Sequence, residues 1–296
     1  MAQDSAPDSA QNSVQESALW VIGCGYVGQA LLRAAPAAGY AQRYGTTRSA
    51  DQLATLTALA ATPLLLTDAA SVPTEDQLRG AHVVVTYPPD SVRDNALAAR
   101  CGGVQRLVYI SSTAVYGGTR GHVDDDTPTA PNDPVGEARA RAERVFLDAG
   151  AVVLRAPGIY GPERGLHMRL PQGRFHFTGQ GDNHISRIHV DDLVGLSLCA
   201  LQRGRPGVAH VVGDLQPTTQ REAVTFLCEH LDLPLPPSQP AETAHRTLRG
   251  DRQVNPQKAL AALGYNLRFP SYREGFVDAM TRSQMRQPLD PKVRPS

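Results

Sequence analysis

Short, wholly apolar runs alternate along the first half of the chain with longer segments that repeat apolar residues every three or four positions. Such runs predict strands buried on both faces, and the longer segments predict amphipathic helices. Regular alternation of the two is typical of an α/β protein with a doubly wound parallel sheet. The predicted strands are 18–22, 40–46, 64–67, 82–86, 106–111 and 152–155, and the predicted helices are 26–35, 51–60, 90–101 and 136–149.

The alternation loosens after Pro157, where Gly, Arg, His and Phe replace the regular pattern. A helix at 189–201 and a strand at 210–212 resume it, and a proline-rich break at 233–240 precedes a last helical section. We therefore expect a Rossmann-type domain and a smaller C-terminal substrate lobe, with a ligand crevice between them. The Rossmann domain covers 18–157 and is completed by about 187–212, whereas the lobe consists of 158–186 and 213–287.

Composition and charge exclude several classes of protein. Acidic and basic side chains are equal in number, so no global field favours nucleic acid or an anionic membrane as a partner. No apolar run approaches the ~20 residues that a membrane span requires. The four cysteines lie far apart and form no Cys-x-x-Cys, which favours a reduced, cytoplasmic protein. The polar residues 1–17 lack the parts of a secretory signal and predict a disordered tail, and 288–296 predict a second tail.

A glycine-rich turn follows the first predicted strand. Its sequence is Gly23-Cys24-Gly25-Tyr26-Val27-Gly28, with the Gly-x-Gly-x-x-Gly spacing, and it opens the first predicted helix. In a dinucleotide-binding turn the first glycine permits the sharp bend, the second lets a pyrophosphate approach the backbone, and the third lets the helix pack on the strand. Residues 23–28 are therefore the predicted pyrophosphate site, at the positive end of the helix dipole.

The end of the second predicted strand bears on the choice of cofactor. An NAD site usually carries an acidic residue there, which accepts hydrogen bonds from the ribose hydroxyls. This chain has Thr47, Arg48 and Ser49, with no acid before Asp51. The guanidinium of Arg48 can pair with a 2′-phosphate, so we predict NADP and keep NAD as the second candidate. The alternative is that Arg48 is a solvated residue before a helix.

Further cofactor contacts are expected where other predicted strands end. Asp68 follows the third strand and either accepts a hydrogen bond from an adenine amino group or caps its own loop. Thr86 and Pro88 end the fourth strand, where the backbone would pass the cofactor. Ser111 ends the fifth strand and is assigned to the cofactor with them.

Several ordered motifs beyond the glycine turn resemble the extended short-chain dehydrogenase/reductase family, which includes nucleotide-sugar epimerases and dehydratases. The first is the strand-end motif Ser-Ser-x-x-Val-Tyr-Gly at 111–117. Similar motifs follow at 154–162 (Leu-Arg…Tyr-Gly-Pro), at 188–193 (His-Val-Asp-Asp) and at 264–275. The resemblance covers roughly 18–282. It implies an NAD(P)-binding, epimerase/dehydratase-like oxidoreductase.

The resemblance also implies a catalytic serine with a Tyr-x-x-x-Lys pair, and this chain keeps only the serine. The serine position falls on Ser112, four residues before Tyr116. The tyrosine position holds Val135, the lysine position holds Arg139, and no lysine occurs before Lys258. Because Val135 has no ionisable group, the family's proton relay cannot run here as usually drawn. Arg139 can still hydrogen-bond ribose hydroxyls of the cofactor, which is one role of the family's lysine.

Ser112, Tyr116 and Tyr160 are the candidate catalytic residues. Ser112 would orient a carbonyl or hydroxyl group of the substrate. Each tyrosine either reaches the crevice as a proton donor or packs at a strand end, and a histidine from 167–189 is a further candidate donor. None of these histidines shows helical ligand spacing, and the acidic run at 124–126 reads as a turn, so no metal site is predicted.

Two departures from the family pattern bear on the substrate. Nucleotide-sugar members carry an arginine three residues before the isoleucine of the His-Val-Asp-Asp segment, and Ile185 takes that position here. Arg187 lies two residues further on, and either substitutes for it or lies on the surface. Thr113 and Ala114 stand where dehydratases carry an acidic pair, which argues against dehydration.

Three hypotheses for the function stay open. The leading one is an NADP-binding oxidoreductase or epimerase-like enzyme with altered acid/base residues, acting on a small molecule such as a sugar or carbonyl compound. The second is a non-catalytic NADP-binding sensor or scaffold, and the third is a nucleotide-sugar epimerase whose proton donor has moved elsewhere. A monomer or a homodimer is compatible with all three.

Overall fold

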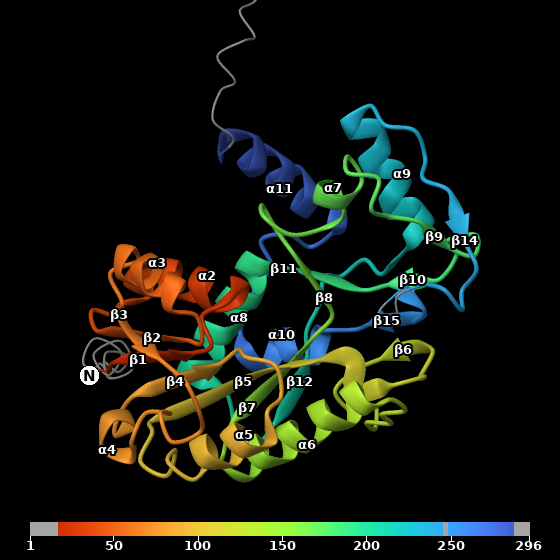
Figure 1. Ribbon diagram of the computed structural model, residues 1–296. Coiled ribbons are helices and arrows are strands. Elements are labelled where there is room, and N and C mark those ends of the chain that lie inside the picture. The colour runs from red at the N-terminus through yellow and green to blue at the C-terminus, as the bar shows by residue number, and fades with distance from the viewer. Residues whose placement is uncertain (1–16, 245–247, 287–296) are drawn as a thin grey trace, which may run out of the picture.

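A seven-stranded parallel sheet forms the centre of the molecule (Figure 1). The computed structural model describes residues 17–244 and 248–286. The strands are β1 (Leu19–Ile22), β2 (Arg43–Thr47), β3 (Thr62–Leu65), β4 (His82–Val85), β5 (Arg106–Ser112), β7 (Val152–Ala156) and β12 (Ala209–Val211). Their order is β12-β7-β5-β4-β1-β2-β3, and every pair is parallel. The order reverses at β1, which confirms the predicted doubly wound, Rossmann-type sheet.

Helices cover both faces of this sheet. On one face lie α2 (Tyr26–Ala34), α3 (Leu53–Ala58), α8 (Val190–Arg203) and α10 (Gln257–Leu263), and on the other α4 (Glu75–Leu78), α5 (Ser91–Ala98) and α6 (Pro134–Asp148). Strand β5 shows why the strands are apolar throughout, since Val108 and Ile110 enter the first core while Leu107 and Tyr109 enter the second. Each side chain is removed from water whichever way it points. Short 3₁₀ turns are η1 (Ala35–Ala38), η2 (Ala50–Gln52) and η3 (Thr113–Tyr116).

The smaller lobe surrounds α9 (Gln220–Leu231) and α11 (Tyr272–Arg286), in the upper part of Figure 1. Its strands are so short that they show no periodicity, which is why the sequence pattern predicted none of them. They are β6 (Gly121–Val123), β8 (Gly158–Tyr160), β9 (Phe177–Thr178), β10 (His184–Ile185), β11 (Arg187–His189), β13 (Thr218–Thr219), β14 (Ser238–Gln239) and β15 (Arg252–Val254), with the short helix α7 (Leu166–Arg169) beside them.

Two segments link the lobe to the main sheet. Strand β6 lies between β5 and α6 in the sequence. It pairs with β15 in a four-stranded sheet of order β13-β10-β15-β6. Helix α10 follows β15 in the chain but packs into the core of the main sheet through Ala259 and Leu263. Strand β6 and helix α10 therefore connect the lobe to the main sheet. Within the described residues, no helix has the length and apolar character needed to cross a membrane.

His82 makes the stability of the fold sensitive to pH. It is 2% exposed at the start of β4, and its Nδ1 lies 2.6 Å from the Tyr40 hydroxyl. Burial, with a smaller contribution from Arg106, lowers its pKa from 6.5 to about 4. The unfolded chain therefore binds a proton that the folded chain rejects, so stability falls as the pH drops from 6.5 towards 4.

We expect His82→Gln to reduce this acid slope by up to ~1.4 kcal/mol per pH unit. Urea unfolding at a series of pH values measures the slope. The exposed His122 provides a matched control, since His122→Gln should run parallel to the wild type. Equal slopes for His82→Gln and the wild type would contradict the assignment.

Candidate functional site

The glycine turn joins β1 to α2 at the predicted place. Gly23 has φ +97°, in the left-handed region that favours glycine. Its N–H donates to Thr46 Oγ1 at 2.9 Å, and the Thr86 hydroxyl donates to its carbonyl. A Cβ on Gly23 would lie only 2.7 Å from the Cβ of Tyr87. The turn is therefore held between β2 and β4 and requires glycine here, while Pro88 is exposed beside it.

The other two glycines differ in what surrounds them. Gly25 is the N-cap of α2, where no side chain caps the amides of the first turn. A Cβ on Gly25 would meet no atom within 4 Å, whereas one on Gly28 would lie 2.9 Å from the Gly23 carbonyl oxygen and 3.1 Å from Val21 Cγ1. Open space at Gly25, close packing at Gly28 and free amide donors are what a dinucleotide pyrophosphate needs.

The residues between the glycines face different surroundings. Cys24 and Val27 are buried beneath the turn. Tyr26 is half-buried, and its hydroxyl reaches the loop after β8. A Cβ on Gly161 in that loop would lie 2.5 Å from the hydroxyl oxygen. The guanidinium of Arg164 in the same loop is 5.8 Å from the centre of the Tyr26 ring. This loop therefore covers the start of α2 from one side.

The ends of β2 and β3 carry the residues predicted to contact the adenosine half of the cofactor. Thr47 is buried, and its Oγ1 accepts the N–H of Ser49 at 3.1 Å. This turn leaves Arg48 exposed directly after β2, with no acidic side chain on the strand. Asp68 is also exposed, but its Oδ1 accepts the N–H of Ser71 at 2.9 Å. Its carboxylate therefore caps its own loop, and Arg48 is the more available of the two side chains.

Two adjacent serines at the end of β5 have different partners. Ser111 is 4% exposed and donates to Oε1 of Glu143 at 2.5 Å. Glu143 also accepts from Nε and Nη2 of Arg155 at 3.1 and 3.0 Å. Arg155 in turn donates to the Tyr116 hydroxyl at 3.1 Å. The sequence assigned Ser111 to the cofactor, but its hydroxyl belongs to this buried network between β5, α6 and β7.

Ser112 is the half-buried serine at the rim of the crevice. Its Oγ accepts the N–H of Ala114 at 3.2 Å, which caps η3 and leaves the hydroxyl proton free to donate. Val135, in the first turn of α6, is 44% exposed near it. Helix α6 comes close to η3 at this point. A Cβ on Gly136 would lie only 2.8 Å from the Ala114 carbonyl oxygen. An uncharged, solvent-facing side chain thus stands where the resemblance places a tyrosine.

Arg139 lies one turn further along α6. Its Nη1 donates to the Tyr109 hydroxyl at 2.8 Å and to the Ile110 carbonyl at 3.3 Å. These two hydrogen bonds hold the Arg139 guanidinium against β5. The predicted contact with cofactor ribose hydroxyls would have to use the remaining guanidinium N–H groups.

The two candidate tyrosines are both buried. The Tyr116 hydroxyl donates to the Asp124 carbonyl at 3.3 Å and accepts from Arg155, and burial raises its pKa against the opposing effect of Arg155. Tyr160 is 2% exposed and packs against Phe276, and burial raises its pKa as well. Both phenols stay protonated at neutral pH. Their surroundings favour packing, the alternative that the sequence left open, over proton donation.

Two histidines of the 167–189 segment, His167 and His189, are buried. His189 is 1% exposed, its Nδ1 accepts the N–H of Asp191 at 3.2 Å, and burial lowers its pKa to about 4. Burial likewise lowers the pKa of His167. His189, Asp191 and Asp278 lie close together, but the Arg282 guanidinium binds both carboxylates, at 2.7 and 3.0 Å. This cluster therefore joins α11 to the start of α8.

The acidic run after β6 is tied down by two basic side chains. Lys258 binds the carboxylates of Asp124 and Asp126, and Asp125 Oδ2 lies 2.7 Å from Nδ1 of His210. The sequence predicted a solvated turn here. The contacts show that the turn also fastens the β6 loop to β12 and α10.

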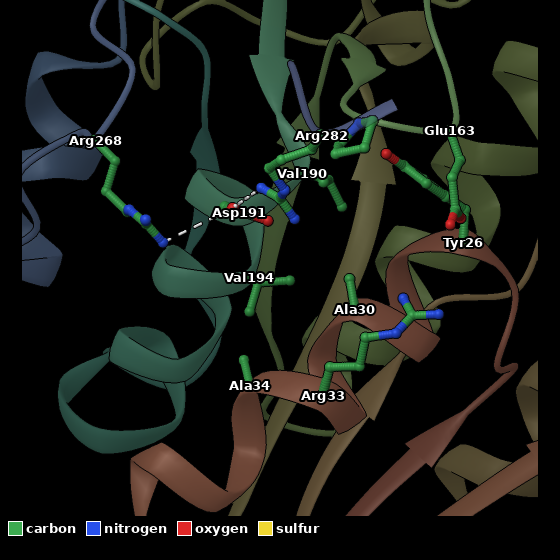
Figure 2. Close-up of a pocket in the computed structure, with 11 residues that line it drawn as sticks. Tyr26, Ala30, Arg33, Ala34, Glu163, Val190, Asp191, Val194, Arg268 and Arg282 are labelled. Carbon is green, nitrogen blue, oxygen red and sulfur yellow. Dashed lines mark hydrogen bonds and ion pairs between the residues drawn. The ribbon is translucent and has the colours of Figure 1, made fainter. Parts of the chain in front are cut away.

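A pocket of about 240 Å³ lies between α2 and α8, and Tyr26 at the start of α2 lines it (Figure 2). The sequence pattern did not predict it. Its wall includes the small apolar side chains Ala30, Ala34, Val190 and Val194 (Figure 2). Among its charged groups, Asp191 pairs with both Arg282 and Arg268.

Comparisons with known proteins agree with this fold. Residues 94–213 match the NAD dependent epimerase/dehydratase family. The chain is 31% identical to a Streptomyces 3-diazoavenalumate denitrifying reductase, over 60% of this chain and 66% of that protein. It is 33% identical to Protein YeeZ of Escherichia coli K12, over 38% of this chain and 40% of that one. It thus matches less than two thirds of the length of these curated relatives.

Solved structures share the fold over nearly the whole chain. A functionally unknown conserved protein from Silicibacter pomeroyi has a TM-score of 0.79 and 29% identity, covering 90% of this chain and 98% of that one. MoeE5 in complex with UDP-glucose and NAD has a TM-score of 0.75 and 21% identity, covering 91% and 99%. Residues 94–213 thus match the model of the NAD dependent epimerase/dehydratase family, and the chain as a whole has the fold of MoeE5. The family match agrees with the resemblance drawn from the motifs at 111–117, 154–162 and 188–193.

Proposed function

We propose that this protein is an NAD(P)H-dependent reductase whose substrate is reduced without a tyrosine proton donor. The observation that carries the proposal is the exposed Val135 in the first turn of α6, the helix that approaches η3 after Ser112, in a chain whose glycine turn has open space at Gly25. The name of the Streptomyces relative, a denitrifying reductase, supports reduction over epimerisation. A bound nicotinamide cofactor would supply the hydride.

The residues of this chain would bind and orient the reactants. The amides at the start of α2, beyond Gly25, would hold the pyrophosphate, and Arg48 the 2′-phosphate of NADP. The Ser112 hydroxyl would donate a hydrogen bond to an oxygen or nitrogen of the acceptor. Arg139 would contribute a fixed positive charge. Protonation of the product would then come from solvent, since Val135 leaves this rim open to water.

The purified protein with NADPH or NADH, mixed with a panel of electron-poor carbonyl and diazo acceptors, tests the proposal. We expect oxidation of the reduced cofactor by at least one acceptor. Measurable cofactor binding without oxidation by any acceptor would contradict the proposal and favour the non-catalytic sensor, which the loss of both tyrosine and lysine also supports. Interconversion of a UDP- or dTDP-sugar without net oxidation would instead favour a nucleotide-sugar epimerase.

We expect Arg48→Ala to reduce the preference for NADPH over NADH. Loss of a charge-assisted pair with the 2′-phosphate predicts about 10- to 100-fold weaker NADPH binding, with little change for NADH. Calorimetric titration of both cofactors measures the ratio. Arg33, an exposed arginine on α2, offers a control of equal charge, and Arg33→Ala should leave the ratio unchanged. An unchanged ratio for Arg48→Ala would remove the argument for NADP.

A further inference from the structure

Arg252 brings a positive charge from the smaller lobe to the rim that carries Ser112. It opens β15, and its Nη1 donates to the carbonyl of Gly117, the residue that ends η3. A Cβ on Gly250 would lie 3.3 Å from its Nη2, so the guanidinium lies over the backbone of its own loop. The Arg252 side chain is half-buried, and its hydrogen bond to Gly117 is made through Nη1.

The charge of Arg252 is only partly compensated. Burial lowers its pKa, and Asp133 and Tyr116 oppose this effect from a distance. Among the described residues, no carboxylate is paired with its guanidinium within 4.0 Å, in contrast to Arg155 with Glu143. A half-buried cation without a close counter-ion is stabilised when an anion binds to it.

The arginine that the sequence suggested for this role lies elsewhere. Arg187 is 5% exposed, and its Nη1 donates to the Ile185 carbonyl at 2.7 Å. Its strand β11 pairs with β8 and packs against α8 and α11. Arg252, by contrast, stands in register with Ile185 on β10, so the two occupy neighbouring positions on one sheet. The pairing of β15 with β6 and β10, which the sequence pattern did not predict, brings Arg252 to Gly117.

We propose that Arg252 binds a carboxylate of the substrate, and that the physiological acceptor is therefore an organic acid. The inference rests on the proposed reductase function and specifies its substrate class. Arg139 from α6 donates to the Ile110 carbonyl and Arg252 from β15 to the Gly117 carbonyl, so two positive charges contact the two ends of the segment 110–117 that carries Ser112. A planar guanidinium binds a carboxylate through two parallel hydrogen bonds, which would orient the acceptor beside Ser112.

A matched pair of acceptors tests this inference. The probes are para-formylbenzoate and its uncharged counterpart para-formylbenzamide, which differ only in the group that Arg252 would bind. We expect Arg252→Met to raise the KM for the acid about 10- to 100-fold and to leave the KM for the amide within about twofold. Arg252→Lys should lie between the two, because it keeps the charge without the planar fork. Arg120→Met is the control, since Arg120 is exposed on the same side of the lobe and its Nε lies 3.7 Å from Asp251.

Three results would overturn the inference. The first is an equal loss with acid and amide, accompanied by a lower Tm, which would give Arg252 only a role in docking the lobe on Gly117. The second is a wild-type preference for the amide. The third is a failure of the cofactor-loaded wild type to bind para-formylbenzoate in a calorimetric titration. That titration needs no turnover, so binding that is lost in Arg252→Met would support carboxylate recognition even if the reductase function itself failed.

Discussion

A valine at Gly25 is expected to abolish dinucleotide binding and to leave the unliganded protein close to wild-type stability. The Cβ position of Gly25 faces open space, and its φ of −78° is one that valine adopts. The added methyl groups would fill the space before the first amides of α2, where we place the pyrophosphate. Loss of two charge-assisted hydrogen bonds of ~1.5–3 kcal/mol each predicts binding at least ~100-fold weaker. Calorimetric titration with NADPH and NADH, beside thermal unfolding, measures both effects.

Gly28→Ala is the matched control with the opposite pattern. A Cβ there would lie 2.9 Å from the Gly23 carbonyl oxygen, so α2 would have to move away from β1. We expect the free energy of unfolding to fall by ~1–3 kcal/mol, although alanine favours an isolated helix. If Gly25→Val bound cofactor as tightly as the wild type, the pyrophosphate would lie elsewhere. If it unfolded, the space at Gly25 would not be open.

Replacement of Glu143 by alanine is expected to lower the free energy of unfolding by ~3–5 kcal/mol, because it leaves the buried charge of Arg155 without a partner. Glu143 is 3% exposed and Arg155 is 8% exposed, and two guanidinium nitrogens bind the one carboxylate. Ser111 would lose its acceptor at the same time. Urea unfolding of the wild type and the variant measures the difference.

Two further variants separate the buried pair from the loss of a charge in general. Glu137 and Arg141 form an exposed pair on the same helix at 3.7 Å, so Glu137→Ala should cost less than ~0.5 kcal/mol. The double variant Glu143→Leu with Arg155→Met removes both charges together and should recover much of the loss. A cost below ~1 kcal/mol for Glu143→Ala alone would show that Arg155 finds another partner or reaches water.

The features that the sequence predicted and the structure contains are those that depend on neighbouring residues. The turn at 23–28 follows β1 and opens α2, because glycine spacing and an apolar run act over a few positions. The resemblance assigned Ser112 and Val135 to the family's serine and tyrosine positions, and in the structure the start of α6 contacts η3, which follows Ser112.

Other parts of the site depend on which side of an element a residue faces. Ser111 and Ser112 are adjacent in the sequence. Ser111 donates to Glu143 on helix α6, whereas Ser112 caps η3. Tyr116 lies in the same motif as Ser112, but burial commits its hydroxyl to Arg155 and the Asp124 carbonyl. Alternation along a strand predicts that neighbours point apart, although it cannot say which face meets which helix.

The sequence by itself determined a parallel α/β fold and a glycine-rich turn between its first strand and its first helix, because both follow from local pattern and residue identity. Tertiary structure alone decided which charges meet. Arg155 finds Glu143 across two elements, and Arg252 reaches Gly117 over a separation of 135 positions. Such contacts follow from strand register and lobe docking, which lie beyond the reach of any periodicity along the chain.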